Sequence, residues 1–231
     1  MTGRSRAAAT ITAMAGYRAE LAVGILAVVV LIAYVVMLGS AGPRSARDDV
    51  AVAPASPIGV PSPPIARDIY LAPIGDFPRE DADALVAHYR ERFDLTIEVL
   101  PSIPVPDEAM DAERGQLIAE RLIDAIVATE VVAEDPDAVV IGLTSMDMYI
   151  AAQDWNYAYG LRSGGTHAVV SKARMDAGFA DEERQRQRLR KMVTKNIGIL
   201  YYGLGVSDDP RSVLYRDILG PGDLDYASED F

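Results

Sequence analysis

Short apolar strands alternate with amphipathic helices from residue 67 onward, and this alternation constrains the fold more than any other feature of the sequence. Apolar runs bounded by turn residues predict four strands, at 68–72, 95–100, 138–143 and 166–171. Apolar residues at helical spacing predict three helices, at 79–93, 107–129 and 181–202. We therefore expect an α/β (α+β) domain over residues 67–231, in which two or three helices cover a twisted mixed sheet.

A second feature is the uncharged run from Leu21 to Pro43, whose core, Leu21–Leu38, is almost wholly aliphatic. About 20 helical residues, rising about 1.5 Å each, cross the hydrocarbon layer of a membrane. The run therefore predicts one transmembrane helix over residues 21–43. A cleaved signal peptide is the alternative, because Gly39-Ser40-Ala41 places small residues where a signal peptidase cuts.

The flanks of this run predict an orientation. Three arginines precede it, and the two that follow it adjoin two aspartates, so residues 1–20 are predicted to be cytoplasmic. Six prolines between Pro43 and Ala66 indicate a semi-rigid linker over residues 44–66. The sequence thus predicts a single-pass protein of the cell membrane, held there by the Leu21–Leu38 helix, with its folded domain extracytoplasmic.

Composition excludes several kinds of site. The chain has no cysteine, so disulfides, thiolate metal sites and thiol nucleophiles are excluded. Its only histidines are His88 and His167, so no three-histidine metal site can form. A net charge of -12 argues against a nucleic-acid partner, because phosphates must be neutralised by basic residues. We expect no nucleic-acid partner and no cofactor.

The C-terminal part resembles the active-site region of the metzincin zinc proteases, in particular the archaemetzincins and matrixins. In that family a helix carries H-E-x-x-H, a glycine ends the helix, a third histidine follows, and a Met-containing turn underlies the metal. Here Gly198 lies inside the helix, Gly203 and Gly205 lie at its exit, and Leu214 takes the methionine's place. Segments 142–149, 155–160 and 168–175 resemble those that precede the zinc helix in archaemetzincins. The resemblance implies a metzincin-like fold for residues 67–231.

The metal-binding residues of the family are replaced. By the resemblance, the three histidine positions hold Lys195, Ile199 (or Leu200) and Val206, and the glutamate position holds Asn196. An aliphatic side chain donates no electron pair, a protonated lysine repels a cation, and asparagine is no base near neutral pH. The resemblance thus implies the fold of a peptidase without its catalytic and metal-binding residues.

Two further groups of residues are candidates for a site. His167 could form a rebuilt metal site with Asp147, Asp154, Asp208 or Asp209, although a lone histidine at the start of a strand is more often structural. Aromatic residues could instead hold an extended peptide along a sheet edge, and they are Trp155, Tyr157, Tyr159, Tyr201, Tyr202 and Tyr215.

Three functions remain open at this point. The first is a membrane-anchored, catalytically inactive metzincin-like domain that binds or scaffolds a protein or peptide partner at the cell envelope. The second is a zinc-dependent metallopeptidase that uses a rebuilt site around His167 and acidic residues. The third is a purely structural domain on a stalk, with no ligand.

Overall fold

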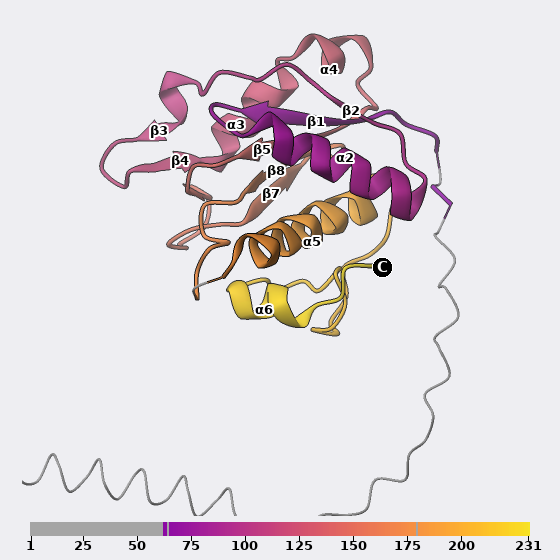
Figure 1. Cartoon of the computed structure of the whole chain (residues 1–231). Helices are drawn as coiled ribbons and strands as arrows, with labels where there is room; N and C mark the ends of the chain where they lie inside the picture. The colour runs from indigo at the N-terminus through magenta and orange to yellow at the C-terminus, as the bar shows by residue number, and fades with distance from the viewer. Residues whose placement is uncertain (1–61, 64, 179) are drawn as a thin grey trace, which may run out of the picture. The chain divides into compact units, whose positions relative to one another are not determined.

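The main sheet has five strands in the order β2-β1-β5-β8-β7 (Figure 1). In this computed structural model, which describes residues 62–231 except 64 and 179, β7 is an antiparallel edge strand and the other four are parallel. The strands are β1 (Ile69–Ile74), β2 (Ile97–Val99), β5 (Val139–Thr144), β7 (Gly160–Ser163) and β8 (His167–Ser171). The prediction of an α/β domain with a mixed sheet is confirmed.

Helices cover both faces of this sheet. The helices α2 (Arg79–Phe93) and α5 (Glu182–Leu200) lie on one face, and α3 (Ala119–Val127) lies on the other (Figure 1). Every residue of β5 is buried, as expected for a parallel strand with helices on both sides. The helix α5 begins where predicted because the Asp181 carboxylate accepts a hydrogen bond from the Arg184 backbone amide.

The helix predicted at 107–129 is only partly correct. The segment instead forms a 3-10 turn (Asp107–Ala109), the short strands β3 (Met110–Asp111) and β4 (Gln116–Ile118), and then α3. The reversal between the strands has a local cause: Gly115 has a φ of 64°, and the Asp111 side chain accepts the backbone amides of Glu113 and Arg114. With β6 (Met148–Tyr149), these strands form a second, three-stranded sheet.

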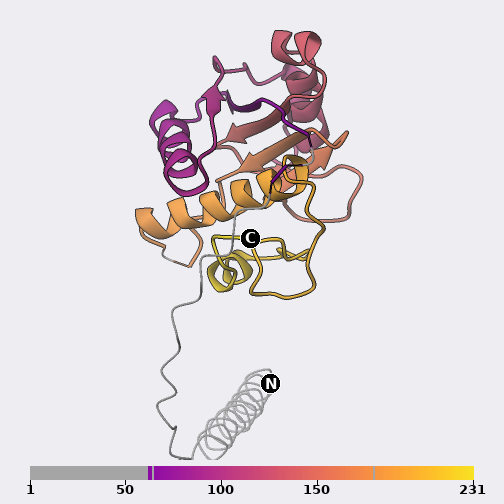
Figure 2. The ribbon, with the colours of Figure 1, turned by 90° about the vertical axis from the view of Figure 1, so that its right-hand side faces the viewer.

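The remaining short elements were not predicted. They are α4 (Glu130–Glu134), β6, β7 and α6 (Pro221–Tyr226). The segment after α5 runs back beneath that helix, on the side away from the sheet, and carries α6 (Figure 2). This places the C-terminal residues against α5, where they close one wall of the site described below.

The membrane prediction requires correction. Within the part of the chain that the structure describes, no helix combines the length and the apolar surface needed to cross a bilayer. The predicted span at 21–43, its cytoplasmic flank 1–20 and most of the linker 44–66 lie outside the described residues. The single-pass membrane location, the membrane contact through Leu21–Leu38 and the extracytoplasmic placement therefore have no support, and they are not carried further.

A glycine inside α5 sets how closely the C-terminal segment packs. A Cβ atom on Gly198 would lie 2.9 Å from Leu214 Cδ2 and 2.6 Å from Phe231 Cε1. Leu214, the residue predicted at the Met-turn position, is thus packed directly beneath the helix. Only a residue without a side chain allows this approach.

We expect Gly198→Ala to lower the free energy of unfolding by about 1–2 kcal/mol, because the added methyl group overpacks this contact by more than the gain in helix propensity. Urea denaturation would measure the change. Gly222→Ala in α6 is the matched control, since a Cβ there meets nothing within 4 Å. Equal effects of the two substitutions would contradict the packing described here.

Candidate functional site: a cleft beside the edge strand

A cavity of about 560 Å³ lies beside the edge strand β7. It is lined by Ile150 and residues 154–162, which we call the first wall, by residues 216–219, which we call the second wall, and by Met192 and Lys195 of α5, which we call the floor. The cleft is therefore built from three segments that are distant in the sequence.

Lys195 lies at the floor of this cavity and is only 4% exposed. Its ammonium group donates to the backbone carbonyl of Tyr215 and, at 3.4 Å, to that of Arg216. No carboxylate lies within ion-pair distance of it among the described residues. A pairing of Lys195 with Asp208 or Asp209, which the sequence makes conceivable, does not form.

Burial, and after it the positive charge of Arg162, lower the pKa of Lys195 to about 8. Arg162, on β7, also borders the cavity, and desolvation lowers its own pKa. Two like charges thus share the cleft. The ammonium group remains mostly protonated at neutral pH.

The other residues that the resemblance assigns to the family motif are Asn196, Ile199 and Val206. Asn196 is buried, donates to the Met192 carbonyl and accepts weakly from Arg162 at 3.4 Å. Ile199 is half-buried, and Val206 is 46% exposed beyond the end of the helix. None of the side chains at these positions can replace an imidazole.

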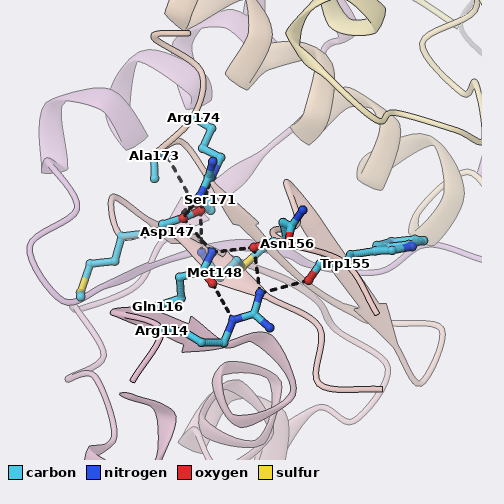
Figure 3. Close-up of polar contacts among 10 residues, drawn as sticks. Arg114, Gln116, Asp147, Met148, Trp155, Asn156, Ser171, Ala173 and Arg174 are labelled. Carbon is cyan, nitrogen blue, oxygen red and sulfur yellow. Dashed lines mark hydrogen bonds and ion pairs between the residues drawn. The ribbon is translucent and has the colours of Figure 1, made fainter. Parts of the chain in front are cut away.

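A polar network supports the loop that forms the first wall (Figure 3). The Asp147 carboxylate accepts from Arg174 Nε at 2.9 and 3.0 Å and from Gln116 Nε2 at 2.8 Å. Gln116 also donates to the Asn156 carbonyl, and Arg114 donates to the carbonyls of Trp155 and Asn156. These bonds fix the backbone of the wall while the Trp155 ring points away from the network (Figure 3).

Burial raises the pKa of Asp147, but hydrogen bonds from Arg174 and Gln116 outweigh it and hold the pKa below its usual range. Arg174 also stacks 4.3 Å from the centre of the Tyr157 ring. The Tyr157 hydroxyl then donates to the Leu219 carbonyl at 2.9 Å and joins the two walls. The network therefore positions both sides of the cleft.

The structure divides the predicted aromatic surface. Trp155, Tyr157 and Tyr159 line the cavity, and the three other tyrosines do not. Tyr202 is buried against Tyr201 and Phe231, and Tyr215 contributes its carbonyl to Lys195. Sequence reasoning missed Arg162, although the alternation that ends at Gly164-Gly165 is a hairpin signal that could have found its strand.

His167 does not form a metal site with the acidic residues that were predicted to join it, as far as the described residues show. It is 8% exposed, and its Nδ1 lies 3.1 Å from Thr166 Oγ1, while Nε2 has no hydrogen-bond partner among the described residues. Burial lowers its pKa.

Three of the four acidic candidates are held by arginines instead of His167. Asp147 pairs with Arg174, Asp208 with Arg216 and Asp209 with Arg211. Asp154 lines the cavity. No group of three or more His, Asp or Glu side chains in the described residues is arranged to hold a metal ion.

The fold and the cleft below an edge strand are those of a metzincin-like zinc metallopeptidase. The chain is 30% identical over 152 residues to an archaemetzincin from Natronomonas pharaonis, a match that covers 62% of this chain and 83% of that protein. The crystal structure of an archaemetzincin from Methanopyrus kandleri superposes with a TM-score of 0.59 at 26% identity, covering 71% of this chain and 89% of that one. A zinc-dependent peptidase from Methanocorpusculum labreanum shares the fold at 19% identity and a TM-score of 0.58, over 71% of this chain and 95% of that one.

The chain belongs to the archaemetzincin family. No family model matches the sequence. The family implies a zinc ion, but the residues present do not fit one: the cleft presents the Lys195 ammonium group, and the other positions that the resemblance assigns to the motif hold an amide and aliphatic side chains.

Lys195 should make stability depend on pH in a defined window. Its folded-state pKa lies below that of an unfolded lysine, so the unfolded chain binds more protons between about pH 8 and 10.5, and the lysine's destabilising effect fades as the pH rises through that range. The difference in unfolding free energy between Lys195→Met and the parent should fall by on the order of 2 kcal/mol between pH 7 and 10. A difference independent of pH would show that Lys195 is not desolvated.

Asp147→Asn should lower the unfolding free energy by about 2 kcal/mol at pH 7, because it removes the charge that Arg174 binds. The folded-state pKa of Asp147 is depressed, so its contribution is present above the unfolded pKa of about 4 and is lost as the pH falls through the lower folded value. Chemical denaturation at pH 7 and pH 3 would measure this loss. Asp83→Asn, in an exposed pair with Arg79, is the control and should change stability by less than about 0.5 kcal/mol.

Proposed function

We propose that residues 67–231 form a peptide-binding domain of the archaemetzincin family that does not hydrolyse the peptide it binds. Lys195 carries the proposal. Its ammonium group occupies the cavity floor and is fixed by two backbone carbonyls, at the position that the family resemblance assigns to the first metal-binding histidine. A cation held there repels a metal ion and supplies neither a Lewis acid nor a base for water.

The preserved cleft supports binding. The strand β7 is the last strand of its sheet in the described chain, so one row of its backbone groups is open for pairing with an extended peptide. Tyr157, Tyr159 and Met192 line the adjacent cavity and offer apolar contact area. The open strand edge and the apolar lining could bind an extended peptide without hydrolysing it.

A second candidate is a zinc-dependent metallopeptidase, and the relatives favour it, because those matched to this chain are archaemetzincins and a zinc-dependent peptidase. Such an activity would require a metal site rebuilt around His167. Its unpartnered Nε2 is the one observation that suits a ligand. The ion pairs that Asp147, Asp208 and Asp209 form with arginines weigh against the rebuilt site.

The two candidates differ in zinc content and in peptide cleavage. The full chain, purified in buffer that contains zinc and then desalted, should hold far less than one zinc per chain by elemental analysis. It should also leave a randomised fluorogenic peptide pool uncut, with or without a chelator. Stoichiometric zinc together with chelator-sensitive cleavage would overturn the proposal.

Histidine variants locate any zinc that does bind. If a site rebuilt around His167 exists, His167→Ala should release the metal. His88→Ala should not release it, because His88 lies on α2 and is not part of that site. Both histidines are shielded and have an unpartnered Nε2 among the described residues, which makes them a matched pair.

A further inference from the structure

Two cations in the cleft, Lys195 and Arg162, have no anionic partner in the described part of the chain. Both hydrogen bonds of Lys195 go to backbone carbonyls, and the one side-chain contact of Arg162 is to Asn196 Oδ1 at 3.4 Å. An ammonium group has three hydrogens to donate, so two carbonyls leave one available. A guanidinium has five, and this contact uses one.

The positive charge of Arg162 adds to the effect of burial in lowering the pKa of Lys195. Both side chains line the same cavity. Like charges in a partly desolvated cleft raise the free energy of the empty site, and an anion placed between them would lower it. Paired donors of this kind bind carboxylates well.

Other charges border the cavity but do not neutralise this pair. Arg216 is paired with Asp208 at 2.8 Å. Asp217 and Asp154 line the cavity as well, yet neither forms an ion pair with Lys195 or Arg162 among the described residues. The carboxylate of Asp217 raises the pKa of Lys195 less than burial and Arg162 lower it.

The backbone of β7 defines how a peptide could approach these cations. Ser171 N donates to the Tyr159 carbonyl, which makes that pair a hydrogen-bonded one in the antiparallel β7–β8 ladder. Because hydrogen-bonded residues alternate along such a ladder, the backbone groups of Gly160 and Arg162 face away from β8, toward the open edge. A strand paired at this edge would pass Arg162 directly.

We propose that the cleft recognises the free C-terminal carboxylate of a peptide whose last residue is apolar, an inference that rests on the proposed peptide binding. The carboxylate lies on Lys195 and Arg162, and the peptide backbone pairs with the open edge of β7. The final side chain packs among the apolar lining, to which Met192, Tyr159 and Ile218 contribute. A cation pair thus fixes the end of a chain, in a cleft whose family fold is that of a peptidase.

The experiment compares two fluorescein-labelled, randomised tetrapeptide pools, one with a free C-terminal acid and one with a C-terminal amide, by fluorescence polarisation with the full chain. We expect the acid pool to bind at least tenfold more tightly than the amide pool. The acid peptides retained by the immobilised protein, identified by mass spectrometry, should be enriched in apolar last residues.

Substitutions of Lys195 and Arg162 test whether these two cations cause the preference for the acid pool. Lys195→Met and Arg162→Gln should each lose most of the preference for the acid pool, and the second substitution is at an exposed position that should not disturb folding. Arg184→Gln, an exposed arginine at the start of the same helix as Lys195, is the control and should keep the preference.

The outcomes separate this inference from the proposed function. Equal binding of acid and amide pools, or a preference that survives both substitutions, would overturn carboxylate recognition and leave peptide binding intact. Absence of binding by either pool would overturn both.

Discussion

The cleft depends on one buried cation. Lys195 lies in the middle of α5, is nearly inaccessible to solvent, and reaches the carbonyls of two consecutive residues in the returning C-terminal segment. A charge in this position costs desolvation free energy unless it is hydrogen-bonded, and the two carbonyls provide those bonds. The interaction also joins the helix to the wall that closes the site.

This arrangement accounts for how a metallopeptidase scaffold can hold its shape with Lys195 at the position that the resemblance assigns to a metal ligand. Three contacts hold the segment after α5: Gly198 admits Leu214 and Phe231, the Ser207 amide donates to the Leu214 carbonyl, and Lys195 donates to the Tyr215 carbonyl. On the opposite wall, the Asp147 network performs the same task for the loop before β7 (Figure 3). Apolar packing and hydrogen bonds thus position both walls of the cleft.

Much of the fold could be predicted because its central elements carry strong local patterns. The continuous apolar run of β5 and the stripe of α2 each specify one structure, and the capping Asp181 fixes the start of α5. The error at 107–129 arose because the apolar spacing of α3 extends backward through residues that Gly115 and Asp111 turn into a hairpin. In this segment the turn formed by Gly115 and Asp111 determines the structure, and the helical spacing of the apolar residues does not.

The site was harder to predict than the fold. The resemblance pointed to Lys195 and Asn196, but nothing local in the sequence indicated that the lysine would bond to carbonyls 20 and 21 residues later. Arg162 escaped notice because β7 is short and half exposed, and its importance comes only from the spatial neighbourhood of α5. Neither Tyr201 nor Tyr202 lines the cleft, because Tyr202 packs on Phe231 and Tyr201 packs on Tyr202.

The absence of a metal site can be tested with a crystal structure of the full chain grown with excess zinc, with anomalous data collected at the zinc edge. We expect Lys195 to be bound to the two carbonyls and no anomalous peak in the cleft. An anomalous peak in the cleft with Lys195 displaced, or one held by His167 and carboxylates, would show that the chain binds zinc.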